Sequence, residues 1–298
     1  MSEGLDTLES GMFYNCKSLK SIIIPGNIKT ICSSAFENCT SLETVEIQEG
    51  VTTLNAINHF RGCSKLKDIS LPSTLTGLGS YTFVGCTSLT NILIPSNIDT
   101  IGEETFENCT SLKTVVIPSN VKTVKFRAFR NCSNLETVEI QEGVENIEGQ
   151  VFDDCTKLSN VKIPSTVKEL LYGVFGDCTN LGNVYILNND IKMNYLNYIT
   201  NYTIYCKSNS TAEAFASEHS IPYVVDDDGP TINYNPNGNS QLAKEQTTIV
   251  NVLDDKSGIR DNSLKYIWSQ SAQAPVLEDF QDNFSNNDSF TKNGDNGD

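Results

Sequence analysis

Apolar positions recur along the chain with a period close to 23 residues. The clearest marker is a phenylalanine, followed three residues later by a cysteine and after three more by a leucine. The cysteines of this series are Cys16, Cys39, Cys63, Cys86, Cys109, Cys132, Cys155 and Cys178. One interval is 24 residues long because of an extra residue within 55–59. A fixed period of this length is typical of a solenoid, in which each repeat forms one coil and packs on the next.

Each repeat follows the pattern F-x-x-C-x-x-L-x-x-V-x-I. Apolar and polar residues alternate at its end, which predicts a short strand with one buried face. In five repeats a proline follows and ends the strand, because proline fixes φ and lacks an N–H donor. These prolines are Pro25, Pro72, Pro95, Pro118 and Pro164. A turn-forming residue lies three positions after the last apolar residue of each strand. An asparagine there can form hydrogen bonds with neighbouring backbone groups. The turn formers are Asn27, Gly50, Thr74, Asn97, Asn120, Gly143, Thr166 and Asn189.

These motifs resemble the BspA-like family of leucine-rich repeats, and the segment 106–118 matches that family's pattern closely. The resemblance extends over roughly residues 4–225. It implies a right-handed leucine-rich-repeat superhelix whose short parallel strands line one face. It also implies a secreted or surface-attached protein, often an adhesin of host-associated bacteria or protists, and it brings no catalytic motif.

The array is expected to end in a cap at about 202–225, within a solenoid domain spanning 1–225. Residues 202–206 read as a last strand, 210–219 as a short helix and 221–225 as a returning strand. Ser210 and Glu213 have the spacing of a capping box at the start of that helix. A cap is needed because the last coil would otherwise expose its apolar edge.

A composition change at 226–230 marks the expected domain boundary. The segments 231–234, 247–252 and 264–268 read as strands separated by turns. They resemble the start of a bacterial immunoglobulin-like domain, and 226–298 holds too few strands for a complete sandwich. Both ends of the chain look cut, which indicates a fragment of a longer protein, so the missing signal peptide carries no information.

The charge balance excludes two classes of partner. The chain holds 37 acidic and 21 basic residues, a formal net charge of −16. Nucleic acids and anionic membranes both attract basic surfaces, so neither is an expected partner. The sequence contains no apolar run of about 18 residues, and no membrane insertion is expected in this fragment.

The periodic cysteines are predicted to be buried free thiols that act as small apolar side chains. Their spacing matches no zinc pattern. Stacked coils place equivalent side chains about 4.8 Å apart, whereas disulfides need Cβ atoms nearer about 3.8 Å and turned toward each other. A serine in their place is expected to lack a sure hydrogen-bond partner. Cys32 and Cys206 lie outside the series and receive no pairing.

No other residues form a convincing catalytic or metal site. His59 and His219 are expected to have surface or capping roles, because neither has convergent partners in the sequence. Asp226–Asp228 and Asp254–Asp255 have two interpretations, a calcium site or a solvated linker or turn. The linker is favoured, because no D-x-D-x-D-G loop is present. No cofactor, metal or catalytic residue is therefore expected.

The outward position of each predicted strand carries the candidate binding residues. It is occupied in turn by Ile23, Glu46, Ser70, Leu93, Val116, Glu139, Lys162 and Tyr185. We predict contacts through the apolar members Ile23, Leu93, Val116 and Tyr185, because grouped exposed apolar residues mark contact sites. Glu46 and Glu139 would tune orientation or exclude acidic partners. The alternative is that apolar residues simply favour strands.

The sequence thus favours a non-enzymatic surface protein that binds a host extracellular protein or glycan through an extended concave face. Two alternatives stay open. One is a passive spacer that holds another domain away from the cell wall. The other is an accessory module of a larger surface hydrolase.

Overall fold

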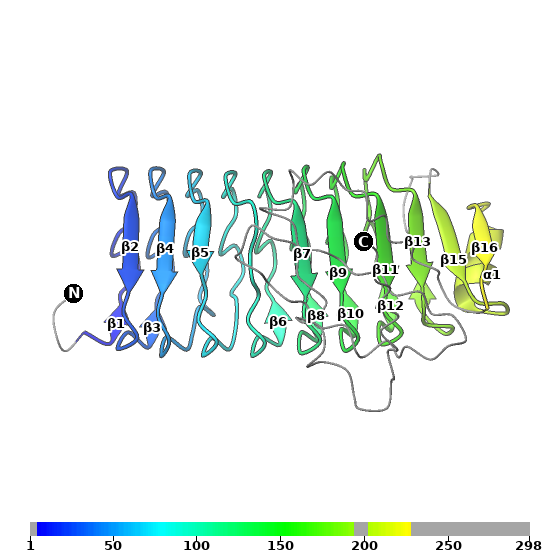
Figure 1. Cartoon of the computed structure of the whole chain (residues 1–298), viewed down its shortest axis with the longest axis horizontal. Helices are drawn as coiled ribbons and strands as arrows, with labels where there is room; N and C mark the ends of the chain where they lie inside the picture. Colours follow the sequence, from blue (N-terminus) through cyan, green and yellow to red (C-terminus); the bar gives the residue numbers. More distant parts are fainter. Residues whose placement is uncertain (1–4, 194–201, 228–298) are drawn as a thin grey trace, which may run out of the picture. The chain divides into compact units, whose positions relative to one another are not determined.

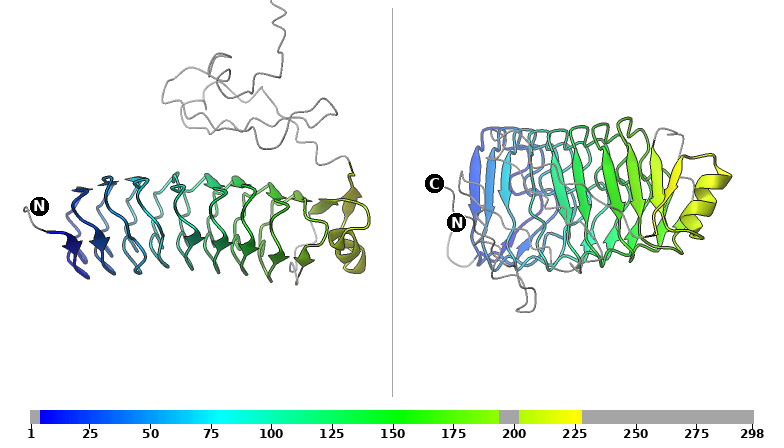
Figure 2. Two further views of the ribbon diagram at one scale, coloured as in Figure 1. Left: turned by 90° about the horizontal axis from the view of Figure 1, so that it is seen from below. Right: turned by 45° about the vertical axis from the view of Figure 1, so that its right-hand side comes forward.

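The computed structural model describes residues 5–193 and 202–227, which form a solenoid of parallel strands closed by a helical cap (Figure 1). We number the coils from one to eight by their phenylalanines, so that coil one begins at Phe13 and coil eight at Phe175. The coils stack along an almost straight axis (Figure 2). The solenoid predicted from the 23-residue period is confirmed.

One side of the solenoid, which we call the strand face, is built from two parallel sheets. The first holds β2 (Ser21–Ile24), β4 (Thr44–Ile47) and β5 (Asp68–Ser70). The second holds β7 (Thr114–Ile117), β9 (Thr137–Ile140), β11 (Asn160–Ile163), β13 (Asn183–Ile186), β15 (Thr203–Cys206) and β16 (Tyr223–Val225). Along these strands apolar residues point into the core and polar ones mostly outward, as the alternating pattern requires.

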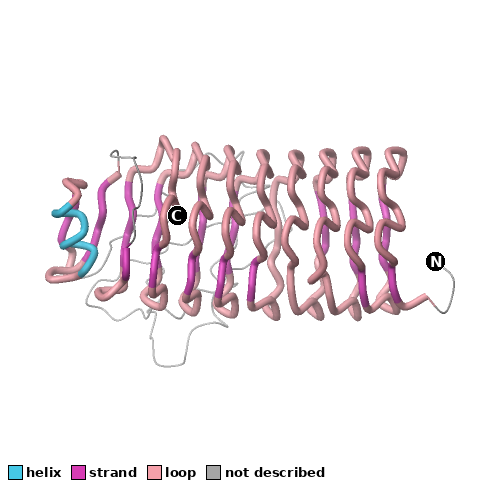
Figure 3. The backbone as a smooth tube through the Cα atoms, turned by 180° about the vertical axis from the view of Figure 1, so that it is seen from behind, coloured by secondary structure: helices cyan, strands magenta, loops and turns pink. Residues whose placement is uncertain are grey.

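A second series of two-residue strands lies across the core from the strand face, and it is visible from behind (Figure 3). β1 (Thr7–Leu8) pairs with β3 (Thr30–Ile31). A five-stranded sheet follows, made of β6 (Thr100–Ile101), β8 (Thr123–Val124), β10 (Asn146–Ile147), β12 (Glu169–Leu170) and β14 (Lys192–Met193). This series comes from a second apolar pair that follows the turn after each strand, for example Val121 and Val124.

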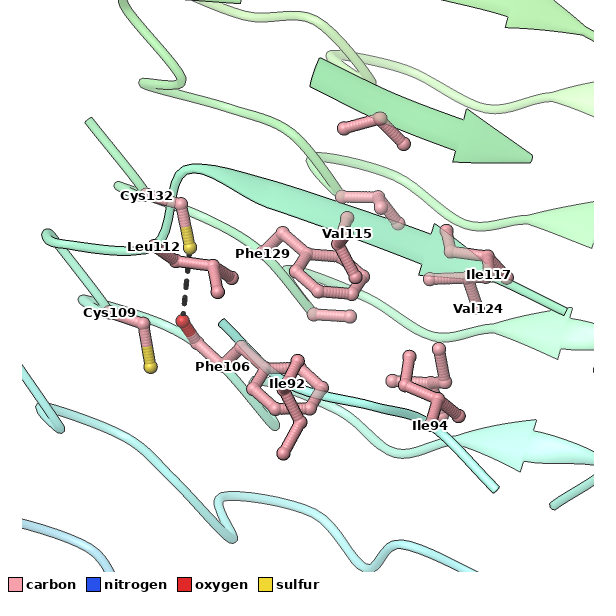
Figure 4. Close-up of a cluster of buried hydrophobic side chains, with 14 of the residues drawn as sticks. Ile92, Ile94, Phe106, Cys109, Leu112, Val115, Ile117, Val124, Phe129 and Cys132 are labelled. Carbon is pink, nitrogen blue, oxygen red and sulfur yellow. Dashed lines mark hydrogen bonds between the residues drawn. The ribbon is translucent and has the colours of Figure 1, made fainter. Parts of the chain in front are cut away.

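The core is a set of side-chain columns that run the length of the array. The phenylalanine rings stack in parallel, with centroids 5.1 Å apart for Phe106 and Phe129. Figure 4 shows these two rings beside the leucine and cysteine columns. The seven periodic phenylalanines of coils two to eight are at most 1% exposed. No single coil can cover its own ring, so stacking is what removes this apolar surface from water.

The turn that carries each phenylalanine and cysteine needs unusual backbone angles. The residue immediately before each periodic cysteine has a positive φ in every coil, for example 61° at Asn108 and 72° at Gly85. Asparagine, glycine or aspartate occupies this position in all eight coils, and these types tolerate the left-handed region best. The recurring choice therefore fixes the turn.

The turn formers after the strands also bond as predicted. The amide of Asn97 donates to Ser73 O in the preceding coil at 2.7 Å, and the hydroxyl of Thr166 donates to Val144 O at 2.7 Å. In coil eight Asn188 fills this role rather than Asn189, donating to Val167 O at 2.7 Å.

The predicted cap is present at the C-terminal end. Helix α1 (Thr211–Glu218) packs against β14, β15 and β16 and buries Ala212 and Ala216. Ser210 is its N-cap: the hydroxyl oxygen accepts a bond from the backbone N–H of Glu213 at 3.1 Å. The Glu213 carboxylate accepts from Asn209 N rather than from the N-cap residue itself.

A strand was predicted in every repeat, but residues 91–94 of coil four form none, and this prediction was wrong.

The chain divides into the unit Met1–Asp228 and a second unit, Gly229–Asp298. The immunoglobulin-like module predicted for 226–298 lies almost wholly outside the described residues, as does the Asp254–Asp255 pair, so both stay predictions.

Candidate interaction face

The six candidate residues lie on the strand face but in separate groups. Ile23 and Glu46 are register partners on β2 and β4. Val116 and Glu139 are partners on β7 and β9. Tyr185 stands on β13. Each therefore occupies the outward position that the alternation assigned to it.

Leu93 is the exception to this arrangement. It lies in residues 91–94, which join neither β5 nor β7. Its side chain is 76% exposed, more than any other large hydrophobic residue described. Leu93 and Val116 occupy the same position in neighbouring repeats, as the sequence indicates, but no strand pairing joins their segments.

The apolar candidates differ in exposure. Ile23 is 57% exposed, whereas Val116 and Tyr185 are only partly exposed. Because the coils follow an almost straight axis, the face is flat rather than the concave surface that was expected (Figures 1 and 2). A flat face suits a partner that lies along several coils.

Sequence reasoning missed Tyr205. It is the register partner of Tyr185, and the two rings have centroids 4.7 Å apart with an interplanar angle of 32°. Burial raises the pKa of Tyr185, and the neighbouring Tyr205 adds to the effect. The signal was present, since 203–206 has the same outward and inward alternation as 183–186. The outward column thus continues into the cap, where Val224 pairs with Tyr205.

The two glutamates belong to an identical segment that occurs twice, at 43–51 and 136–144. Within it, Glu49 is a structural residue: its carboxylate accepts bonds from the N–H of Ser73 at 2.8 Å and of Thr74 at 3.2 Å. These bonds hold the pKa of Glu49 below its usual value. Glu142 binds Ser165 and Thr166 in the same way. Glu49 and Glu142 therefore hold the next coil in place and are not candidates for ligand binding.

A charged ladder that the sequence analysis did not identify lies at the phenylalanine turns. Arg130 contacts Glu107 at 3.1 Å and Asp153 at 3.0 Å, one partner in each neighbouring coil. The three residues each follow a core phenylalanine, so their repeat position could have revealed them. Next to them, burial raises the pKa of Glu104 to about 7, and its hydrogen bond with Glu107 adds to the shift.

The cysteines are free, as predicted, and no disulfide links them in the described residues. Their thiols are hydrogen-bond donors, which was not predicted. Cys132 Sγ donates to Phe106 O in the preceding coil at 3.2 Å (Figure 4). Each periodic cysteine from Cys39 to Cys178 makes the equivalent bond at 3.0–3.3 Å. A serine at these positions was expected to lack a sure partner, and the Phe carbonyl that accepts from each thiol is the acceptor available to it.

The two histidines differ. His219 is the C-cap of α1, and its Nδ1 lies 2.9 Å from Phe215 O, which confirms the capping role. His59 is fully buried, so the surface role assigned to it was wrong. Its Nε2 lies 2.9 Å from Ile31 O. Burial lowers the pKa of His59 to about 4.

The position explains why His59 is buried. It precedes Phe60, and from coil two onward the residue before each periodic phenylalanine is buried. The equivalent residues, all 0% exposed, are Ala35, Thr82, Thr105, Ala128, Val151 and Val174. Comparison across repeats would have placed His59 in the core.

The model of the BspA type leucine rich repeat region matches residues 1–113 and 99–220. The chain belongs to this family. Its members are repeat proteins, which are typically non-enzymatic, and no catalytic constellation is evident in the described part of this chain.

Solved structures similar to this chain are leucine-rich repeat proteins of bacteria. A protein from Bacteroides ovatus is 19% identical, covers 74% of this chain and 87% of its own, and has a TM-score of 0.43. One from T. pallidum is 23% identical over 70% and 86%, with a TM-score of 0.44. A leucine rich cell surface protein from Faecalibacterium prausnitzii is 21% identical over 73% and 79%, with a TM-score of 0.34. None of the curated proteins compared with the chain matches it.

Two further observations concern residues 5–193 and 202–227 alone. No helix in these ranges is long and apolar enough to cross a membrane. No group of three or more histidine, cysteine, aspartate or glutamate side chains in them is arranged to hold a metal ion.

Proposed function

We propose that the protein is a non-enzymatic interaction or adhesion protein, secreted or displayed at a cell surface, that binds a host extracellular protein or glycan through the strand face. This proposal rests on the strand face, where each coil presents one variable outward residue. Two of these residues, Ile23 and Leu93, are aliphatic and more than half exposed. Exposed apolar side chains in line on one surface favour a contact role.

The chemistry of the face supports a few apolar anchors with charged residues between them. Leu93 and Ile23 offer aliphatic surface, and the Tyr185–Tyr205 pair offers aromatic surface with hydroxyl groups. Tyrosine is enriched among the residues that dominate binding energies at interfaces. Glu46 and Glu139 then affect orientation and salt dependence more than affinity.

The test compares the parent with the double variant Leu93→Glu/Tyr185→Ala. Binding is measured against a panel of purified extracellular matrix proteins and a glycan array. We expect the parent to bind at least one of them and the double variant to lose about tenfold or more in affinity, because interfaces depend on a few anchors. Val116 is left unchanged, since a glutamate there would stand beside Glu139 and repel it.

The matched control is Ile57→Glu. Ile57 is also an exposed aliphatic residue, at 46%, but it lies in the turn before Phe60, outside the strand face. The control should bind like the parent, and all variants are compared at equal thermal stability. Unchanged binding by the double variant places the site elsewhere. No binding by the parent to any partner on the panel favours the passive spacer.

A further inference from the structure

The hydrogen-bond ladder of the strand face is interrupted at residues 91–94, which we call the coil-four gap. One sheet ends at β5 and the next begins at β7, so two successive inter-coil steps lack a ladder (Figure 1). Thr90 O accepts a single bond from Lys113 N at 3.2 Å. One coil later Lys113 O accepts two, from Glu136 N at 2.9 Å and from Thr137 N at 3.3 Å.

Proline placement explains the position of the gap. Where the residue after the strand has an N–H, that group bonds to the preceding coil: Gln48 N to Ile24 O at 2.9 Å, and Gln141 N to Ile117 O at 3.0 Å. Proline cannot supply this donor. Pro72, Pro95 and Pro118 occupy the position in coils three, four and five. Elsewhere a proline coil is followed by a coil that restores the bond, so only here do three successive steps lose it.

The opposite series of short strands is irregular between coils one and four. Between β3 and β6 the described residues make only isolated bridges, Thr30 with Thr53, Leu54 with Leu78 and Leu78 with Ile101. The extra residue of the 24-residue interval lies within 55–59, in coil two. Both strand series therefore lack regular pairing at one shared step, between coils three and four, whereas β6 and β8 pair regularly at the next step.

The phenylalanine side stays continuous through this region. The rings of Phe60 and Phe83 have centroids 5.6 Å apart, and those of Phe83 and Phe106 5.3 Å apart. The thiols of Cys86 and Cys109 bond to the preceding coils at 3.3 Å, as in the rest of the array. The coils are therefore joined at every step along the phenylalanine side and by fewer backbone pairs along the strands, which is the contact pattern of a hinge.

We propose that coil four is a hinge of the solenoid, at which coils one to three tilt against coils five to eight about the phenylalanine stack. The motion opens and closes the strand face beside Leu93 and changes its curvature. Hinge motion needs a few residues that absorb the change while the parts on each side stay rigid. The inference rests on the contacts alone and does not depend on the proposed binding role.

The first experiment restores the missing donors. The double variant Pro95→Gln/Pro118→Gln places in coils four and five the residue that coils two and six already carry. Hydrogen exchange is followed by mass spectrometry. In the parent we expect the amides of 92–94 to exchange about tenfold or more faster than those of 138–140, because exchange reports local opening. In the double variant this difference should fall to about threefold or less, since the restored ladder suppresses local opening.

The control for this experiment is Pro164→Gln. Pro164 is a single proline between coils that supply the donor, so its replacement should leave the exchange of 92–94 unchanged. Equal protection of 92–94 and 138–140 in the parent would overturn the hinge. So would an equal gain in protection from the control variant.

The second experiment measures the motion itself. Spin labels are attached at Lys20→Cys and Glu136→Cys, two exposed positions in coils one and six, with the half-buried Cys16 and Cys32 replaced by alanine. Five coil steps separate the labels by about 24 Å. We expect a broad distance distribution that narrows with Pro95→Gln/Pro118→Gln and not with Pro164→Gln. A narrow distribution in the parent rejects the hinge, whatever the exchange data show.

Discussion

At the scale of single residues, the periodic cysteine is a donor as well as an apolar side chain. Its thiol joins adjacent coils by a bond to a phenylalanine carbonyl, as Cys109 does, and burial raises the pKa of Cys109. A raised pKa keeps the thiol protonated and able to donate. Residue spacing alone could predict that the thiols are buried, but not that each one faces a carbonyl, because that depends on the exact turn.

The thiol bond makes a prediction at Cys132. Cys132→Ser keeps a donor toward Phe106 O, so we expect it to destabilise the protein by about 1 kcal/mol. Cys132→Ala loses the donor and leaves a small cavity, for which we expect about 2 kcal/mol. Urea unfolding of both variants checks the order. If serine destabilises more than alanine, the thiol bond contributes nothing.

His59 makes the stability of the protein depend on pH. Its pKa in the folded state is about 4, below the usual 6.5, because burial disfavours the charged ring. The folded state therefore binds fewer protons, and stability falls as the pH drops from about 6.5 to about 4. Glu104 acts in the opposite sense: its pKa of about 7 in the folded state makes stability rise as the pH drops from about 7 to 4.5.

We expect His59→Thr to remove the acid-side loss, on the order of 2–3 kcal/mol between pH 6.5 and 4. Threonine is the natural residue at this position in the next two coils, Thr82 and Thr105, where its hydroxyl donates to backbone carbonyls. The measurement is the free energy of unfolding at several pH values. Taking the difference from the parent cancels the Glu104 contribution. Parallel pH profiles for parent and variant would contradict the assignment.

At the scale of elements, the strands and the cap could be predicted because each repeat carries its own complete signal. The alternation at 114–117 predicts β7, and the spacing of Ser210 and Glu213 predicts the start of α1. Residues 91–94 have the same alternation but form no strand. The cause lies outside the repeat, in the successive prolines of three coils, and a reading of one repeat at a time cannot detect it.

The same reasoning applies to the candidate face. Outward positions were predictable from the period of two, and Ile23 and Glu46 lie where they were expected. Exposure was not predictable, because Val116 and Tyr185 are covered in part by their neighbours in adjacent coils. Tyr205 was missed because its segment was read as a cap strand and was not aligned with the repeats.

The N-cap of α1 can be tested directly. Ser210→Ala removes the oxygen that accepts from Glu213 N, and we expect a loss of about 1 kcal/mol. Ser217→Ala, in the exposed last turn of the same helix, is the matched control and should change stability by less than about 0.5 kcal/mol. Thermal and urea unfolding measure both. If Ser210→Ala left the stability unchanged, helix α1 would be held in place by its packing alone.

At the scale of the whole solenoid, stability is a sum of coil stabilities and of interfaces between neighbouring coils. The interfaces are unequal. Phenylalanine stacking and thiol bonds repeat at almost every step, whereas the strand ladders are missing at the coil-four gap. An array of this kind does not need to open evenly from its ends, because its weakest interface can separate two groups of coils that each remain folded.

The ten cysteines allow this to be observed coil by coil. In the native protein Cys16 and Cys32 are half-buried and the other eight are buried, so we expect two thiols to react quickly with an alkylating reagent and eight to be protected. In moderate urea, pulse labelling with peptide mapping should show Cys39 and Cys63 reacting at similar rates, about tenfold faster than Cys132 and Cys155. The alkylation rate should change in a step across coil four, because the strand-face ladder is missing there.

Fraying from the N-terminal end would instead give a smooth decrease in the alkylation rate from Cys39 to Cys178. Pro95→Gln/Pro118→Gln should reduce the step by strengthening the weak interface, and a smooth gradient in the parent would show that the interfaces are equivalent.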